Sequence, residues 1–215
     1  MLHVGITALT DLTSLTHLCV DEVYNECTVA ASDLAITLPS LQHLRYLNVN
    51  GCTIGDSCAA LHSLAQLTAL TYLVVTKTAI SESTVNDFAA ALKQLKMLQV
   101  LHMGEDKLNT SANEVACALS DKQELRVVVV EWCGLGRSGA EAIIRAVESL
   151  PCIEHLDLDG NVPEDDYYLV PKCSRKGRPN SEVVDPLFLH TWVMIGEFSD
   201  KYTSFDVDIM EALLQ

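Results

Sequence analysis

The sequence GLGRSG at residues 134–139 has the residue types of a phosphate-binding turn. Glycines in a GxGxxG pattern let a backbone approach a dinucleotide pyrophosphate at a helix N-terminus, and Asp157 lies about where an acid would bind the ribose. However, three residues separate the apolar segment 127–130 from Gly134, whereas a phosphate turn follows its strand directly. The run therefore predicts a strand-to-helix turn, and we expect no nucleotide cofactor.

Residue types that serve as nucleophiles and metal ligands occur, but not in catalytic spacings. The chain has seven histidines and eight cysteines, and its sequence contains no GxSxG, HExxH or CxxC motif. Most of the cysteines fall within apolar periodic segments, which is typical of reduced, buried cysteines in a cytoplasmic protein. We therefore expect a cytoplasmic protein that is not an enzyme, with no catalytic residues, no metal site and no cofactor.

The charge balance excludes further classes of partner. Asp and Glu total 29 whereas Lys and Arg total 14, which gives a formal net charge of −15. Such an acidic surface repels a phosphate backbone, so nucleic acid is not an expected partner. No apolar run reaches the length of about 18 residues that a membrane span needs. A basic partner would be attracted, although an acidic balance also serves solubility alone.

The segments that carry these residues recur with a regular period. In each copy, apolar residues alternate over a short stretch that predicts a strand, and a Cys, Asn, Thr or Asp follows it in all but the weaker first copy, which has Val23 there. The remainder of each copy has apolar residues at helical spacing. The central apolar residues of the six copies, 26 to 29 residues apart, are Leu18, Leu47, Leu73, Leu101, Val128 and Leu156.

A strand–helix unit of this kind can bury its apolar side only against its neighbours, so the units must stack. The expected fold class is α/β: a solenoid shaped as a horseshoe arc, with parallel strands on the concave face and helices on the convex face. Residues 1–162 hold about six units, of which the first is truncated and has its strand at 2–4. Residues 163–215 are expected to form a C-terminal cap, with a mobile loop near 172–182 and a degenerate last strand near 184–194 that continues the register.

Units of this length with true helices resemble the ribonuclease-inhibitor type of leucine-rich repeat domain. The run CGLGRSGAEAIIRAVESLPCIEHLDLDGN, residues 133–161, is also similar to the C-terminal repeats of NOD-like receptors, which are cytosolic immune sensors. The resemblance covers roughly residues 1–162, whereas the receptors' nucleotide-binding motif GxxxxGK[ST] does not occur in this sequence. It implies the sensing and autoinhibitory region of an innate immune protein, which a microbial or danger ligand or a protein partner engages.

Two hypotheses for the function follow. The resemblance favours a recognition module attached to other domains of a longer parent chain. The alternative is a stand-alone inhibitor that blocks a basic enzyme with its acidic arc, as ribonuclease inhibitor does. That alternative predicts a capped N-terminus and binding that weakens steeply with salt, and the truncated first unit favours the receptor hypothesis.

The repeat register also predicts which side chains face the concave surface. The residues on either side of each central apolar residue point outward, and equivalent residues on adjacent strands lie about 4.8 Å apart. Apolar residues in such rows suggest a partner, although the C-terminal segment could instead fold over them. The predicted partner-binding residues are Tyr46, Asn48, Tyr72, Val74, Val100, His102, Val127, Val129, His155, Asp157 and Asp159.

Overall fold

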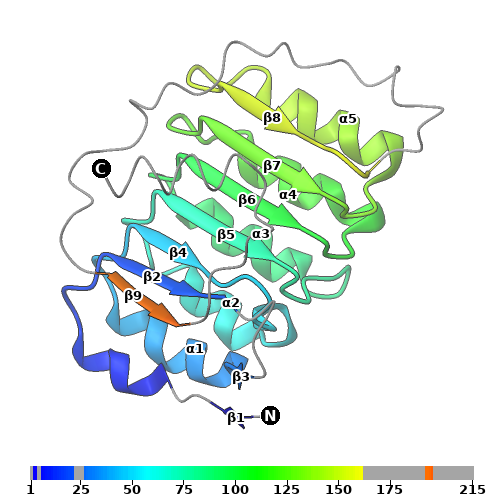
Figure 1. Ribbon diagram of the computed structural model, residues 1–215. Coiled ribbons are helices and arrows are strands. Elements are labelled where there is room, and N and C mark those ends of the chain that lie inside the picture. Colours follow the sequence, from blue (N-terminus) through cyan, green and yellow to red (C-terminus); the bar gives the residue numbers. More distant parts are fainter. Residues whose placement is uncertain (1, 4–5, 22–26, 162–191, 196–215) are drawn as a thin grey trace.

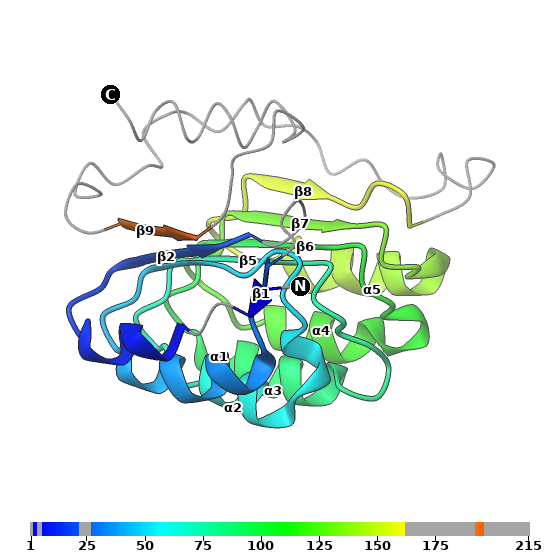
Figure 2. The same cartoon turned by 60° about the horizontal axis from the view of Figure 1, so that its bottom comes forward.

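The computed structural model describes residues 2–3, 6–21, 27–161 and 192–195. Strand–helix units are stacked side by side, so that the strands form one layer and helices α1–α5 form a second layer on one side of it (Figure 1, Figure 2). The larger sheet has seven parallel strands in the order β8-β7-β6-β5-β4-β2-β9 and is open at both edges. The α/β solenoid expected from the repeat is therefore the fold of this chain.

Six of these strands pair in the register that the repeat predicts. The central apolar residues of neighbouring strands face one another, from the Leu18–Leu47 pair at one end to the Val128–Leu156 pair at the other. The first five of them have no exposed surface, and Leu156 packs against the same core. These strands are β2 (His17–Val20), β4 (Tyr46–Asn48), β5 (Tyr72–Thr76), β6 (Val100–Gly104), β7 (Val127–Glu131) and β8 (His155–Asp157).

The helical side of each unit completes this core. In α3, Val85, Phe88 and Leu92 recur at helical spacing and are fully buried, because they point back at the sheet. The side chain of Ser57 caps α2 by accepting a hydrogen bond from the backbone N–H of Ala60 at 3.3 Å. The helices are η1 (Ile6–Asp11), α1 (Ala31–Thr37), η2 (Leu38–Ser40), η3 (Ile54–Asp56), α2 (Cys58–Leu64), α3 (Val85–Gln94), η4 (Asn109–Ser111), α4 (Ala112–Leu119) and α5 (Gly136–Val147).

In two of the units, the polar residue that follows the strand binds the backbone of the preceding unit. Asn161 donates from Nδ2 to the carbonyl of Val130 at 2.6 Å and accepts at Oδ1 from the backbone N–H of Cys133 at 2.8 Å. Two units earlier, the carboxylate of Asp106 accepts the backbone N–H groups of Thr78 at 3.0 Å and Ile80 at 3.2 Å. These side chains satisfy backbone groups that the turn out of the sheet would otherwise leave buried and unpaired.

The two ends of the repeat differ from the sequence-based expectation. Leu2 and His3 do not start the larger sheet: they form β1 (Leu2–His3), which pairs with β3 (Cys27–Thr28) in a separate two-stranded sheet. At the other end, β9 (Trp192–Ile195) pairs in parallel with β2 at the edge of the sheet opposite β8, where it satisfies the N–H and C=O groups of an edge strand (Figure 1).

The rest of the C-terminal expectation lies outside the described residues. This holds for the loop near 172–182, for the basic stretch 172–178 within it and for the part of the predicted strand before Trp192. The cap over residues 163–215 therefore stays a prediction.

Removing the side chain of Leu101 tests the shared core. Leu101 is fully buried between its counterparts on β5 and β7, so Leu101→Ala should lower the free energy of unfolding by about 2–5 kcal/mol, through lost burial and the cavity left behind. Urea unfolding followed by circular dichroism measures this loss. The matched control is Met97→Ala, whose side chain is 51% exposed and should change stability by no more than about 0.5 kcal/mol. Equal losses of stability in both variants would contradict a core built on the aligned central apolar residues of the strands.

Candidate functional site

Ten of the eleven predicted site residues lie in two adjacent rows on the concave side of the sheet. The first row runs from Tyr46 through Tyr72, Val100 and Val127 to His155, in register across five strands. The second row runs in the same way through Asn48, Val74, His102, Val129 and Asp157. Asp159 follows β8 and donates its backbone N–H to Oδ1 of Asp157 at 3.0 Å. The repeat register therefore predicts this grouping correctly.

Aromatic rings occupy the start of the first row. The rings of Tyr46 and Tyr72 stack with centroids 4.8 Å apart and 29° between their planes, and His17 on β2 extends the stack at 6.0 Å from Tyr46. Burial, with a smaller contribution from the positive charge of Arg45, lowers the pKa of His17 to about 4. His17 is therefore neutral at physiological pH and adds an uncharged ring to this end of the row.

The valines of the two rows are buried. Val100, Val127 and Val129 form a hydrophobic cluster with Tyr72 that is separate from the interior core between sheet and helices. The exposed fraction of these valines, and of Val74, is at most 8%. The apolar part of the predicted surface is therefore not an exposed patch in this conformation. Tyr72, His102, His155, Asp157 and Asp159 keep accessible surface.

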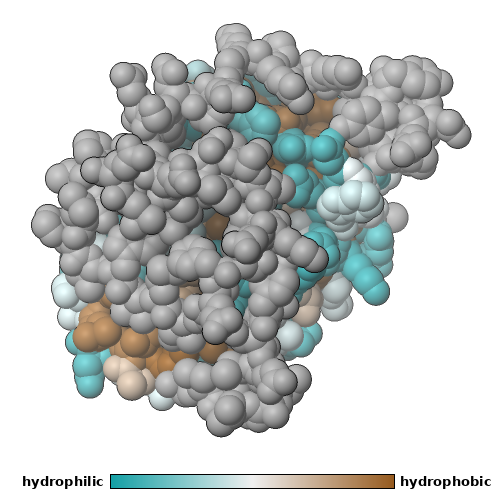
Figure 3. Space-filling view, viewed as in Figure 1, coloured by the Kyte–Doolittle hydropathy of each residue, from teal (hydrophilic) through white to brown (hydrophobic). Residues whose placement is uncertain are grey.

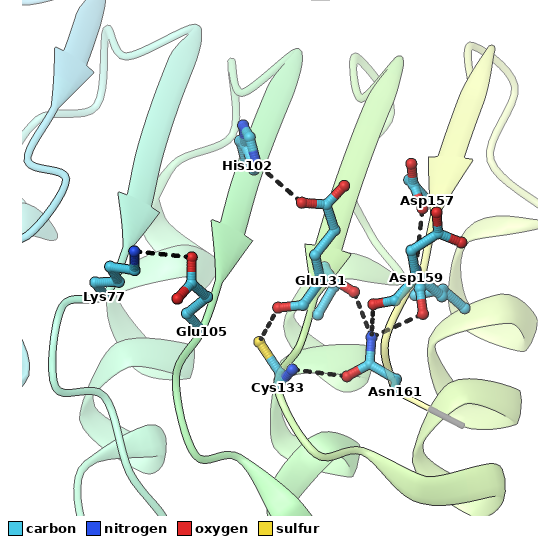
Figure 4. Close-up of polar contacts among 10 residues, drawn as sticks. Lys77, His102, Glu105, Glu131, Cys133, Asp157, Asp159 and Asn161 are labelled. Carbon is cyan, nitrogen blue, oxygen red and sulfur yellow. Dashed lines mark hydrogen bonds and ion pairs between the residues drawn. The ribbon is translucent and has the colours of Figure 1, made fainter. Parts of the chain in front are cut away.

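Carboxylates gather at the carboxyl ends of β6, β7 and β8, where the surface is hydrophilic (Figure 3). We call this group the acidic rim, and it consists of Glu105, Glu131, Asp157 and Asp159. Lys77 pairs with Glu105 at 3.1 Å, and Nε2 of His102 lies 3.9 Å from Glu131 (Figure 4). Burial raises the pKa of Asp157, and the negative charges of Asp159 and Glu131 raise it further. The rim therefore has a negative potential that a cation would relieve.

A row of residues with left-handed backbone follows the strands at one repeat position, one residue beyond β5, β6 and β7 and three residues beyond β4 and β8. Gly51 and Gly160 have φ of 79° and 72° there, whereas Lys77, Glu105 and Trp132 have φ of 55°, 52° and 54°. Gly51, Lys77, Glu105 and Trp132 each donate the backbone N–H to a carbonyl of the next unit at 2.8 to 2.9 Å. A side chain in this conformation costs about 1 kcal/mol or more relative to glycine.

Trp132 is the residue of this row that sequence reasoning missed. Its side chain is 65% exposed, although it is a large aromatic group. In the sequence, Trp132 could have been noticed because the units of β4 and β8 have glycine at the equivalent position, Gly51 and Gly160. That signal is weak from sequence alone, because only the backbone angles identify the position as left-handed.

The structure confirms a strand-to-helix turn at the first two glycines of residues 134–139. Gly134 and Gly136 have φ of 66° and 60°, which glycine adopts without strain, and α5 begins at Gly136. Gly139 has a different role, since a Cβ there would lie 2.8 Å from Cβ of Ala112. It allows α5 to pack closely on the preceding unit.

Two of the described cysteines, Cys19 and Cys133, are buried, whereas Cys58 and Cys117 are exposed. Burial raises the pKa of the Cys19 and Cys133 thiols to about 12, so both are protonated and unreactive at neutral pH. Within the described ranges, no group of three or more His, Cys, Asp and Glu side chains is arranged to hold a metal ion. None of the helices described is long and apolar enough to cross a membrane.

Comparison with known proteins found a family model and solved structures to which this chain is similar. A family model for the Leucine Rich repeat matches residues 40–59. Among solved structures, the tropomodulin C-terminal domain of Caenorhabditis elegans is similar at 11% identity with a TM-score of 0.50, over 86% of this chain and 91% of that one. An internalin (inlF) from Listeria monocytogenes is similar at 16% identity with a TM-score of 0.26, over 74% of this chain and 66% of that one. No curated protein sequence matches. The stacked units and the repeat model support a leucine-rich repeat domain.

Asp106, at the turn below the rim, should make stability depend on pH. Its side chain is buried, and burial raises its pKa from 3.8 to about 7 against the hydrogen bonds from Thr78 and Ile80. The folded state therefore holds the carboxyl proton of Asp106 more tightly than the unfolded chain does. Protonation of Asp106 contributes its full stabilisation of the folded state below pH 3.8, and this contribution is lost as the pH rises to about 7.

The variant Asp106→Asn keeps an acceptor oxygen without the charge. At pH 8 it should be more stable than the wild type by about 1 kcal/mol or more, and at pH 5 the difference should be smaller. Urea unfolding at the two pH values measures this, with the exposed Asp11→Asn as a control for loss of one negative charge. The same difference at both pH values would show that Asp106 does not titrate with folding.

Proposed function

We propose that this chain is a non-catalytic recognition module that binds a protein or another ligand on the concave side of its sheet. The observation that carries the proposal is the alignment of outward side chains from consecutive strands into rows that end at the acidic rim. Leucine-rich repeat domains commonly bind partners, and the parallel stack presents a wide surface that no single unit could form.

The two parts of this surface have different proposed roles. Tyr72, His102, His155, Asp157 and Asp159 are accessible, so these side chains make the contacts with the partner. The buried residues Tyr46, Asn48, Val74, Val100, Val127 and Val129 lie beside them in the same two rows and limit their movement. Because the rim is acidic, it also attracts a basic partner over a distance and accelerates its association.

The finer proposal concerns the parent protein. The similarity of residues 133–161 to NOD-like receptor repeats supports a cytoplasmic innate immune sensor, in which this region senses a microbial or danger ligand and keeps the receptor inactive. The acidic rim equally supports the second candidate, a stand-alone inhibitor of a basic enzyme. The complete transcript separates the two: the receptor proposal expects an upstream nucleotide-binding domain with a GxxxxGK[ST] motif, and an open reading frame without one would exclude it.

A photocrosslinker on the concave side tests the binding surface directly. With p-benzoylphenylalanine in place of Tyr72, irradiation of cells that express the chain should attach the partner covalently, because the ring at this position retains exposed surface in the first row. The matched control carries the same crosslinker at Lys93, an exposed residue of α3 on the helical side, and should give no such product. Mass spectrometry identifies the product. A partner attached only from Lys93 would place the binding surface on the helices instead.

A further inference from the structure

Trp132 presents an indole at the edge of the acidic rim. Its backbone N–H donates to the carbonyl of Asp159 at 2.9 Å, and the equivalent position on the adjacent strand is Glu105. The side chain is 65% exposed. Large aromatic groups exposed to this degree on a rigid element are common at recognition sites, because they offer contact area with few rotatable bonds.

The backbone of the next unit fixes the position of this ring. A Cβ added to Gly160 would lie 2.3 to 2.6 Å from three atoms of the indole, so the ring rests directly against this glycine. The ring is therefore packed against Gly160, while Trp132 as a whole remains 65% exposed. A ring held in this way needs no ordering when a ligand arrives.

Charges around the ring are mostly negative. Glu131 precedes Trp132 in the chain, and Asp157 and Asp159 lie on the neighbouring unit. Among the described residues at this edge, Lys77 pairs with Glu105 at 3.1 Å, and Nε2 of His102 lies 3.9 Å from Glu131. A cation placed over the indole would interact favourably with its π face and with these carboxylates together.

We propose that Trp132 and the acidic rim bind an arginine or lysine side chain of an extended basic segment in a protein partner. The cationic group lies against the exposed face of the indole, and the carboxylates of Asp157 and Asp159 accept its hydrogen bonds. This site rests on the proposed function and deepens it, because it gives the chemistry of the partner.

The left-handed backbone of Trp132 supports a role in binding rather than in folding. The units of β4 and β8 have glycine at the equivalent position, namely Gly51 and Gly160, and their strands pair normally. A side chain is therefore dispensable for the turn and strained within it. The variant Trp132→Gly should accordingly keep or raise the midpoint of unfolding while it loses binding.

The test uses a fluorescein-labelled nonapeptide in which arginine and glycine alternate, with a matched peptide that has glutamate in place of arginine. Fluorescence anisotropy with the full chain should give binding of the arginine peptide only. Trp132→Gly should weaken this binding about tenfold, and Trp132→Phe should weaken it less, because a phenyl ring keeps part of the cation–π attraction. Asp159→Asn should weaken it several-fold and reduce its dependence on salt.

A second measurement reports on the ring itself. The chain has two tryptophans, so in a Trp192→Phe background the remaining fluorescence comes from Trp132 alone. The unlabelled arginine peptide should change this fluorescence, whereas the neutral sugar chitohexaose should not. A response to the sugar alone would overturn the proposal in favour of a glycan site.

Unchanged peptide affinity in a folded Trp132→Gly variant would also overturn the proposal, as would absence of peptide binding to the wild type. Neither result bears on the crosslinking from Tyr72, which tests the concave surface with the native partner. A failure of the arginine site and a failure of the proposed function are therefore distinguishable.

Discussion

Burial of apolar side chains between neighbouring units is the interaction on which this whole molecule depends. A single unit exposes its central leucine or valine, the apolar face of its helix and the edge of its strand, so it cannot be stable alone. In the stack, the column from Leu18 to Val128 is completely buried, and the turn residues Asp106 and Asn161 bind backbone groups of the preceding unit. The units therefore share one core and one register.

The same register builds the recognition surface. Strands that must align their buried residues also align the outward residues on either side, so side chains far apart in sequence become neighbours. Tyr46 and Tyr72 stack for this reason, and Glu131 comes near His102 in the same way. Because each strand ends at the same edge, the residues that follow the strands gather there as well. The acidic rim and Trp132 are consequences of this shared ending.

The sequence predicts what depends on the repeat and misses what depends on its exceptions. The buried column, the two outward rows and the turn at residues 134–139 follow from periodicity and were predicted correctly. The pairing of β9 with β2 joins segments that are distant in sequence, and no local pattern encodes such a contact. The burial of Val127 also depends on its three-dimensional surroundings rather than on the strand alternation. Trp132 could not be predicted from the sequence, because its left-handed φ and its exposed side chain are known only from the three-dimensional structure.

The strand β9 has a consequence for the way the solenoid loses its structure. In a linear array of units, the terminal units have one neighbour each and normally fray first, while the centre persists. Here the hydrogen bonds of β9 protect the outer edge of β2, so this terminal unit has a partner on both sides. Amide hydrogens of β2 should exchange with solvent as slowly as those of an interior strand. The contact between distant parts of the chain thus gives the array a cooperativity that tandem repeats alone do not provide.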